Sequence, residues 1–306
     1  MNALVLGGTG FLGSHLVDRL LASGHSVRVL DRQQELYRAP LPAVDCHIAD
    51  FGNRAQLHST LEGRDLVFHL VSTTVPRTSN DDPAFDVTSN VVETIYLLEQ
   101  CVRERVKKVV FVSSGGAVYG TPAAVPVSED GQKNPESSYG IAKLTIESYL
   151  ELFHRLHGLD YTIVRPSNPY GPRQNPLGNQ GVIAVFMGRM ARGQAVEVWG
   201  DGRTVKDYLF IDDLVEGIYR AATLNPPSHV FNLGSGIGHS VNDLVRLIGE
   251  AVGRPLDVIH SSKQTHDVSR IVLDISRARR ELDWEPTTPM ELGLRRTWEF
   301  ITQAMR

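Results

Sequence analysis

A glycine-rich turn between a short apolar run and an amphipathic segment is the feature that most constrains the fold of this chain. Residues 3–6 are all apolar, which is typical of a strand buried on both faces, and residues 11–21 repeat apolar side chains at helical spacing. Gly7, Gly10 and Gly13 lie where the first segment passes into the second, so they permit a tight turn and the close approach of a pyrophosphate group. The sequence therefore predicts a dinucleotide-binding site near its beginning.

The same alternation of apolar runs and helical stretches continues over the first half of the chain. Further strands are predicted at residues 26–30, 46–49, 66–71, 109–112 and 161–164, and helices at residues 54–61, 90–104 and 138–157. Strands that alternate with helices indicate a doubly wound parallel sheet of the Rossmann type, and thus an α/β protein. We expect residues 1–166 to form this domain, with its sheet completed by parts of 205–235.

The second half of the chain differs from the first in composition and in its pattern of predicted elements. Residues 167–181 are rich in Gly, Pro and Asn, and a loop of this length in a compact domain suggests a binding role. Helices are predicted at 182–192, 211–222 and 241–252, with a strand at 196–199. We expect residues 167–306 to form mainly a smaller substrate-binding lobe that is interleaved with the end of the sheet.

Composition excludes several classes of function. The 306 residues include 31 Lys and Arg against 35 Asp and Glu, a net charge of −4, and no basic segment is dense enough to predict nucleic-acid binding. No apolar run of spanning length and no signal-like segment is found, so we expect no membrane role. Cys46 and Cys101 lack CxxC spacing and lie among apolar residues, which predicts buried free thiols in a cytoplasmic protein.

The end of the second predicted strand indicates which dinucleotide binds. Glycine turns also occur in α/β domains that bind no nucleotide, but Asp31 lies where a carboxylate accepts hydrogen bonds from an adenosine ribose and repels a 2′-phosphate. This favours NAD over NADP, although Arg32 could pair with such a phosphate. Asp50 and Phe51, after the third strand, would flank the adenine, and Asp50 could also cap a helix.

The most informative polar residues are Tyr139 and Lys143, four apart on a predicted helix. This spacing places both side chains on one face, where the ammonium group can lower the pKa of the phenol and make Tyr139 a base near neutral pH. Ser113 and Ser114 close the fifth strand, at the edge where an open sheet presents its ligands. His154 and His157 lack a third ligand at metal spacing, so no metal site is expected.

The glycine turn, the acid after the second strand, the serine pair and the Tyr-x-x-x-Lys motif, in this order, resemble the extended short-chain dehydrogenase/reductase family over essentially the whole chain. The chain looks most like the NAD-dependent nucleotide-sugar epimerases of the UDP-glucose 4-epimerase group. The resemblance implies bound NAD, a UDP-sugar substrate, and a homodimer formed as a four-helix bundle by residues 90–104 and 138–157. Candidate apolar contacts of the dimer are Leu144, Tyr149 and Leu152. Further implied NAD contacts are Phe11, Leu12, Leu70, Val71, Ser72 and Pro166.

Several local matches extend the resemblance. Asn90 matches the family asparagine that helps to anchor the lysine through water, and Asn168 matches the asparagine that touches the sugar-nucleotide phosphate. Lys206 replaces the usual arginine of a later segment, which keeps the charge but loses the bidentate fork. Lys263 and Arg270 lie where the family brings further cations, and solvated surface charges would fit them equally well. The remaining implied substrate contacts are Val182, Val198, Trp199 and Arg203.

Two positions depart from the pattern of the family. Gly115 stands where most such epimerases carry the Ser or Thr that binds the sugar hydroxyl, so either Ser114 takes this role or Tyr139 reaches the hydroxyl directly. Ile271, four residues after Asp267, matches a position that lines the pocket beside C2 of the sugar. Its intermediate bulk predicts a preference for UDP-glucose and UDP-galactose over N-acetylated sugars.

Absent acids separate the possible reactions. Gly116 and Ala117 stand where the related dehydratases and decarboxylases carry acids, while Asn168 and Asn175 replace the Thr and Arg of uronate epimerases. The sequence therefore predicts epimerisation of a neutral UDP-hexose at C4 through a 4-keto intermediate, with Tyr139 as the base. The alternatives are a 4-ketosugar reductase that uses exchangeable NADPH, and a non-catalytic dinucleotide-binding regulator. Retention of the cofactor would separate the first of these from an epimerase.

Overall fold

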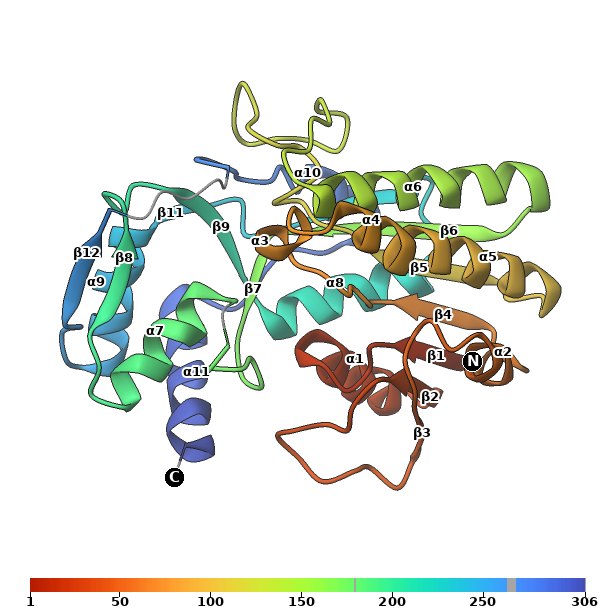
Figure 1. The fold of residues 1–306 in the computed structure, drawn as a ribbon, viewed down its shortest axis with the longest axis horizontal. Helices are drawn as coiled ribbons and strands as arrows, with labels where there is room; N and C mark the ends of the chain where they lie inside the picture. The colour runs from red at the N-terminus through yellow and green to blue at the C-terminus, as the bar shows by residue number, and fades with distance from the viewer. Residues whose placement is uncertain (179, 263–267, 306) are drawn as a thin grey trace.

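Seven strands form the sheet at the centre of the larger lobe (Figure 1). The computed structural model describes residues 1–178, 180–262 and 268–305. The strands lie in the order β10-β6-β5-β4-β1-β2-β3, and every neighbouring pair is parallel. They are β1 (Asn2–Leu6), β2 (Ser26–Asp31), β3 (Val44–Ile48), β4 (Leu66–His69), β5 (Lys108–Val112), β6 (Asp160–Pro166) and β10 (Val230–Leu233). This order confirms the predicted doubly wound sheet, and its direction reverses between β1 and β4, where such folds bind their ligands.

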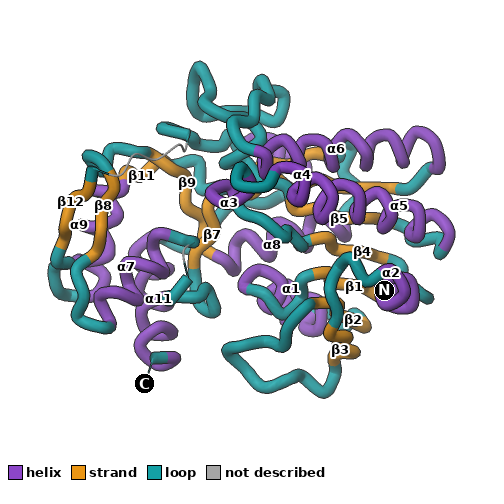
Figure 2. The backbone as a smooth tube through the Cα atoms, in the orientation of Figure 1, coloured by secondary structure: helices purple, strands orange, loops and turns teal. Residues whose placement is uncertain are grey.

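Helices cover both faces of this sheet (Figure 2). Ala3 and Val5 of β1 pack in an apolar cluster with α1 and α8, whereas Leu4 and Leu6 pack in a second cluster with α2, α5 and α6. The helices are α1 (Phe11–Ala22), α2 (Arg54–Leu61), α5 (Glu93–Arg103), α6 (Ser138–His157) and α8 (Ile211–Thr223). Because successive side chains of a strand point to opposite faces, the all-apolar run at the start of the chain fills both clusters.

The helical segment before α5 is longer and less regular than the sequence predicts. After a short helix α3 (Pro76–Ser79), the chain forms α4 (Pro83–Asp86), a π-helical turn η1 (Val87–Val92) and then α5. The predicted helix at 90–104 thus begins inside the π-helical turn. Such turns are rare and are frequent at functional sites, which directs attention to the side chains of this segment.

The smaller lobe is built around two small sheets. One has the strand order β11-β9-β7 and the other pairs β12 with β8. Its strands are β7 (Asn168–Tyr170), β8 (Val196–Trp199), β9 (Val205–Phe210), β11 (Gly238–Ser240) and β12 (Val258–Ser261), and its helices are α7 (Val182–Ala191), α9 (Val241–Val252) and α11 (Met290–Ala304). Helix α10 (Ser276–Leu282) packs beside β10. The predicted loop at 167–181 therefore contains β7, and of the 205–235 segment β10 joins the large sheet while β9 lies in a small one.

A buried carboxylate, Asp207 of β9, joins the two lobes. Its oxygens accept hydrogen bonds from the backbone N–H and the hydroxyl of Ser235, both at 2.7 Å, and from the N–H groups of Gly236 at 3.1 Å and Leu273 at 3.2 Å. Burial raises the pKa of Asp207, while these donors lower it. The carboxylate thus fixes β9 to the turn after β10 and to the segment that follows β12.

The two cysteines differ, and one prediction about them is wrong. Cys101 of α5 is fully buried, and burial raises the pKa of its thiol. Cys46, predicted to be buried, is exposed because β3 is the edge strand of the sheet and has a neighbour on one side only. Within the described residues, no helix combines the length and apolar character needed to cross a membrane.

Candidate active site

Backbone geometry requires glycine at two positions of the loop between β1 and α1. Gly7 adopts a φ of +83°, in the left-handed region, and its N–H donates to the carbonyl of Leu30 at 2.9 Å. A Cβ atom at Gly13 would stand 2.1 Å from the carbonyl oxygen of Gly7, so a side chain there would push the helix off the loop. The helix begins at Phe11 without a side-chain cap, which leaves the N–H groups of its first turn for a ligand.

A cavity of about 220 Å³ opens from this loop along the ends of β1, β2 and β4. Of the predicted NAD contacts, nine line it: Gly7, Gly10, Asp31, Arg32, Asp50, Phe51, Leu70, Val71 and Ser72. The sequence missed four further lining residues, Leu30, Gln33, Ala49 and Thr73, each adjacent to a predicted one. The lining residues come from the ends of neighbouring parallel strands, where a doubly wound sheet binds a dinucleotide.

Two acids in this cavity are fixed by backbone donors. Asp31 accepts hydrogen bonds from the N–H groups of Thr9 at 3.0 Å and Arg32 at 2.7 Å, and Asp50 accepts one from Gly52 at 2.8 Å. These donors orient Asp31 between the glycine loop and the end of β2. A glycine cradle that a Cβ atom would fill, next to an oriented carboxylate, fits a dinucleotide with a free ribose diol. The other predicted contacts are not among the residues that line this cavity, and they lie on three elements: Phe11, Leu12 and Gly13 on α1, Tyr139 and Lys143 on α6, and Pro166 at the end of β6.

Tyr139 and Lys143 lie one turn apart on α6, as the spacing predicts. The helix is capped by the hydroxyl of Ser137, which accepts a hydrogen bond from the N–H of Gly140 at 3.2 Å. The Lys143 ammonium donates to the carbonyl of Val112 at 3.0 Å and lies 5.6 Å from the centre of the Tyr139 ring. The Ser114 hydroxyl lies close enough to the Tyr139 phenol to lower its pKa. The structure therefore brings Ser114, Tyr139 and Lys143 together at the end of β5.

The acidity of this pair differs from the sequence prediction. Burial raises the pKa of Tyr139 to about 12, and the nearby Ser114 hydroxyl lowers it only in part. Burial also lowers the pKa of Lys143 to about 8. The expectation that the ammonium group lowers the pKa of the phenol toward neutral pH is thus wrong in this structure, because desolvation outweighs the distant ammonium.

Asn90 and Ser113 form other contacts. Asn90, in the π-helical turn, accepts a hydrogen bond from the N–H of Thr73 at 2.9 Å and donates to the backbone and side chain of Asp86 at 3.0 and 2.9 Å. Ser113 donates its hydroxyl to Glu147 at 2.5 Å, within a buried network in which Glu147 pairs with Arg165 at 2.6 Å. Ser113 therefore supports the end of β5, whereas Ser114 contacts the phenol.

The structure explains the glycine at position 115. A Cβ atom on Gly115 would stand 2.6 Å from the side chain of Leu273 and 3.0 Å from the carbonyl oxygen of Pro166. Leu273 thus occupies the space that a serine or threonine side chain would need. Two routes were considered for the sugar hydroxyl, and the closeness of Ser114 to Tyr139 is consistent with the one through Ser114.

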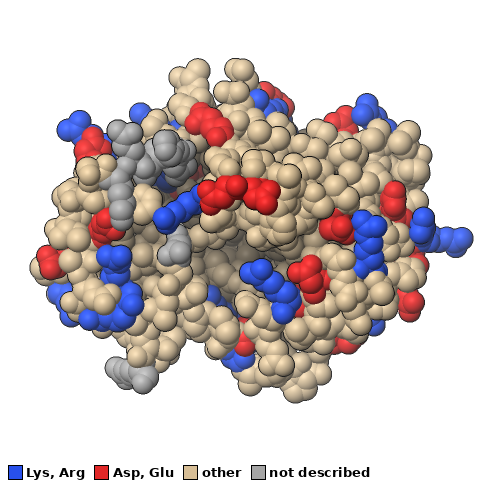
Figure 3. All heavy atoms as spheres, in the orientation of Figure 1, with Lys and Arg blue, Asp and Glu red and all other residues tan. Residues whose placement is uncertain are grey.

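The predicted substrate contacts come from the small lobe. Asn168 and Lys206 lie on the paired strands β7 and β9, Val198 and Trp199 end β8, and Val182 begins α7. Arg270 forms a bridge with Val205 at the start of β9. Figure 3 shows that the face of the molecule is hollowed between the lobes. The pairing of β7 with β9 and the bridge from Val205 to Arg270 therefore bring together residues that are 102 positions apart in the sequence, from 168 to 270.

Some substrate candidates are less well placed than others. Asn168 donates to the carbonyl of Asp207 at 3.1 Å, and Arg203 is largely exposed and pairs with Asp201 at 3.6 Å. Ile271 is buried in an apolar cluster with Val118, Tyr119, Val127, Val268 and Leu273. Lys263 and Asp267 lie outside the described residues. Arg77 of α3, which the sequence did not indicate, lies over the Trp199 ring at 5.3 Å and links the lobes.

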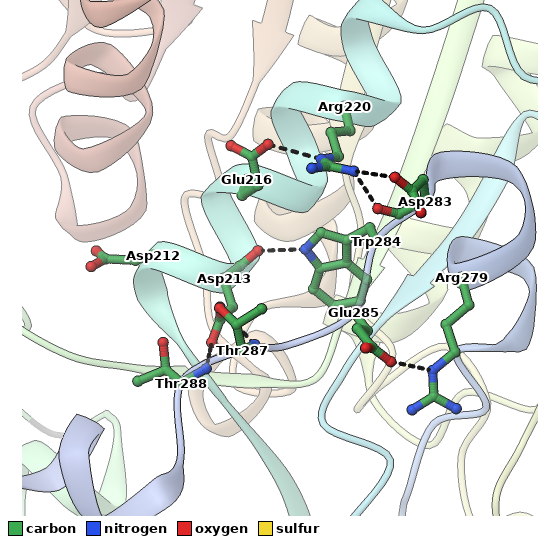
Figure 4. A pocket seen from close by; sticks show the side chains of 10 residues that line it. All are labelled: Asp212, Asp213, Glu216, Arg220, Arg279, Asp283, Trp284, Glu285, Thr287 and Thr288. Atoms are coloured by element: carbon green, nitrogen blue, oxygen red, sulfur yellow. Dashed lines mark hydrogen bonds and ion pairs between the residues drawn. The ribbon is translucent and has the colours of Figure 1, made fainter.

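Another cavity, of about 650 Å³, lies between α8 and the segment after α10 and contains none of the predicted site residues (Figure 4). Asp213 accepts hydrogen bonds from Thr287 and Thr288 at 2.9 to 3.0 Å, and its carbonyl accepts one from the Trp284 indole at 2.9 Å. Arg220 binds the carbonyl of Leu282 at 3.2 Å. These contacts fasten the segment after α10 to α8, so this larger cavity lies at a structural contact and not at the predicted site.

The two histidines of α6 differ in exposure. His154 of α6 is half-buried and bonds to the carbonyl of Leu159 at 3.1 Å, while His157 is exposed at the end of the helix. In the part of the chain that the structure describes, no three or more His, Cys, Asp or Glu side chains gather as a metal site.

The parallel sheet and the cavity at its switch point together are those of a dinucleotide-dependent enzyme. The model of the NAD dependent epimerase/dehydratase family matches residues 3–234, and the chain belongs to this family.

Relatives of assigned function are similar to this chain over nearly its full length. A UDP-glucose 4-epimerase of Mycolicibacterium smegmatis is 40% identical, with 98% of each chain covered. The structure of UDP-glucose 4-epimerase from Thermotoga maritima with UDP-glucose superimposes with a TM-score of 0.95 at 37% identity, with both chains fully covered at 100%. The Thermus thermophilus UDP-glucose 4-epimerase in complex with NAD gives a TM-score of 0.92 at 31% identity, covering 98% of this chain and 99% of that one.

Proposed function

We propose that this protein interconverts UDP-glucose and UDP-galactose by inverting the hydroxyl group at C4. The observation that carries the proposal is the closeness of Ser114 to Tyr139, one helical turn from Lys143, in a chain whose glycine loop opens on a cavity that fits a dinucleotide. A 4-epimerase needs one group that removes and later returns a proton at a single hydroxyl, and this site offers such a group. The full-length similarity to enzymes of this name supports the same reaction.

Tyr139 is the base and then the acid of the reaction. As phenolate it takes the proton of the C4 hydroxyl, and as phenol it returns the proton after the 4-keto sugar has turned over in the pocket. When bound, NAD supplies the acceptor and donor of hydride and a positively charged ring. Lys143 adds a second positive charge near the phenol, and these charges favour the phenolate that burial opposes. Ser114 holds the phenol oxygen in position.

Other acids near the site are already bound, which favours epimerisation over elimination. Glu147 pairs with Arg165 at 2.6 Å, and Glu136 accepts the N–H of Thr121 at 2.8 Å. Gly116 and Ala117 supply no acid of their own. A dehydratase needs a further acid to expel water, so the side chains at the end of β5 suit a reaction without elimination.

The small lobe binds the nucleotide in this proposal. Lys206 on β9 and Arg270 beside it provide positive charge for the diphosphate, and Asn168 provides an amide. Lys206 is buried, which strengthens its interaction with a phosphate. Because it is a lysine, it lacks the planar fork that an arginine would offer the phosphate. The uracil and sugar then lie between these strands and Ser114.

The test is turnover of a panel of UDP-hexoses by purified protein without added cofactor. We expect interconversion of UDP-glucose and UDP-galactose, and release of NAD when the protein is denatured. Turnover that requires added NADPH and a 4-keto sugar would identify a reductase, and retention of NAD without turnover of any hexose would identify a regulator. Either result would overturn the proposal.

We also propose a homodimer in which α5 and α6 of two copies form a four-helix bundle. Leu144 and Tyr149, two of the predicted contacts, pack partly against the protein's own core. Phe85 of α4, Val92 of η1 and Ile141 of α6 are exposed large apolar side chains, at 53%, 40% and 52%, and both α4 and η1 contact α6. Covering them would remove apolar area from water, which favours association. A monomer that does not change with concentration in sedimentation would contradict this.

We propose a cytoplasmic location on the basis of the cysteine thiols. Cys46 is exposed and unpaired, and a free exposed thiol suits a reducing compartment such as the cytoplasm. Localisation of a tagged protein in the native cell would test it.

A further inference from the structure

A buried carboxylate beside Tyr139 and Lys143 has no part in the mechanism above. Asp86 ends α4, directly before the π-helical turn, and is 0% exposed. One carboxylate oxygen accepts a hydrogen bond from the Asn90 amide at 2.9 Å and another from the Thr74 hydroxyl. The second oxygen accepts the hydroxyl of Ser138 at 2.7 Å. Asp86 therefore joins the loop after β4, the π-helical turn and the first residue of α6.

The position of this contact on α6 makes it relevant to chemistry. Ser138 immediately precedes Tyr139, and its backbone N–H is held by Asn80 at 2.9 Å. The hydroxyl of Ser138 thus connects Asp86 to the turn of α6 that carries the phenol. Since proton transfer depends on the distance and direction of the phenol oxygen, a movement of this turn would slow the reaction.

The charge of Asp86 acts on both members of the pair. It raises the pKa of Lys143 against burial, which alone lowers it, and the balance lies at about 8. The same charge raises the pKa of Tyr139 further above its ordinary value. A carboxylate at this place therefore favours a charged lysine and a protonated phenol.

The other titratable groups around Lys143 play different parts. Glu147 also raises the pKa of Lys143, but it is neutralised by its ion pair with Arg165 at 2.6 Å. Burial and, to a smaller extent, the charge of Lys143 lower the pKa of His69 of β4 to about 3, so its ring is neutral. Asp86, in contrast, is held by hydroxyl and amide donors.

We propose that Asp86 is a positioning residue, which ties the π-helical turn to the start of α6 and sets the charge balance around Tyr139 and Lys143. The inference rests on the proposed function, because it assigns Asp86 to the half of the cycle in which the Tyr139 phenolate takes the proton of the substrate hydroxyl. Without this negative neighbour the phenolate would form more readily but would be a weaker base, and the phenol would return its proton more readily. The residue thus keeps the two directions of proton transfer close to balance.

The first test measures the titration of Lys143 by NMR of protein labelled at the lysine side chains. Lys143→Arg identifies the signal. In Asp86→Asn, which keeps size and most hydrogen-bonding capacity, we expect the titration to move to lower pH by roughly 1 unit. A titration at the wild-type pH would overturn the charge role. The measurement needs no substrate, so it stands even if the hexose panel shows no turnover.

A second test uses Ser138→Ala, which removes the tie but keeps the charge. Ser148→Ala, on an exposed part of the same helix, is the matched control. We expect Ser138→Ala to lower kcat by roughly 10-fold while Lys143 titrates close to the wild-type pH. Equal kcat values in the two serine variants would overturn the positioning role. This pair also carries the test if Asp86→Asn does not fold.

Discussion

The two lobes build their binding surfaces in different ways. The contacts of the large lobe come from short stretches at the ends of β1, β2, β3 and β4, and nine of the predicted residues line one cavity. Those of the small lobe come from β7, α7, β8, β9 and the segment after β12, which meet only through the pairing of two small sheets. A site of the first kind can be predicted from residues that are neighbours in the sequence, whereas a site of the second kind depends on how strands pair.

Tyr139→Phe tests the proposed base on α6 and should have the largest effect on turnover. Removing the phenol oxygen deletes the proton-transferring group while the ring still packs, so we expect kcat to fall by roughly 10²- to 10⁴-fold. NAD content after denaturation and the melting temperature should stay at the wild-type values. Activity within a few-fold of wild type would show that chemistry occurs elsewhere.

Gly13→Ala tests whether the cofactor lobe depends on close backbone packing. The new Cβ would meet the Gly7 carbonyl at 2.1 Å, so we expect the free energy of unfolding to fall by about 1 to 3 kcal/mol. Gly10→Ala is the control, because its Cβ meets only the same oxygen at 3.4 Å. Thermal and urea unfolding should separate the two variants, and equal stability would remove the packing argument.

Asp31→Ala tests the carboxylate that is predicted to select NAD over NADP. Loss of the ribose acceptor should weaken NAD binding by roughly 10- to 100-fold, as for a charge-assisted hydrogen bond, and narrow the gap between NAD and NADP. Titration of the cofactor-free protein with each dinucleotide measures both effects. An unchanged dissociation constant for NAD would mean that the acid at the end of β2 does not bind the ribose.

Ile271→Ser tests the small lobe and should have the smallest effect on turnover. A shorter side chain should improve the ratio of kcat/KM for UDP-N-acetylgalactosamine over UDP-galactose, by about 1 to 3 kcal/mol in discrimination. Because Ile271 is buried, the same change should also lower stability by roughly 2 to 5 kcal/mol.

Val127→Ala, in the same apolar cluster, controls for that loss of packing. A ratio that is unchanged in Ile271→Ser, or equally changed in Val127→Ala, would show that another residue sets the pocket.

The sequence predicted features that depend on local pattern. Apolar runs located the strands, and the glycine spacing with Asp31 located the dinucleotide cavity, because each follows from neighbours in the chain. The exposure of Cys46 follows from β3 being an edge strand, which only the assembled sheet reveals. The role of Asp86 depends on Thr74 and Ser138, 12 residues before and 52 after it, and the high pKa of Tyr139 depends on burial. These arise from tertiary packing, which no window of sequence contains.

The contact between Gly115 and Leu273 couples two positions of this site. A serine at position 115 would collide with Leu273. A shorter residue at position 273 would relieve the shortest contact that a side chain at position 115 would make. Positions 115 and 273 are 158 residues apart in the sequence, yet we expect a substitution at one to change which residues the other accepts.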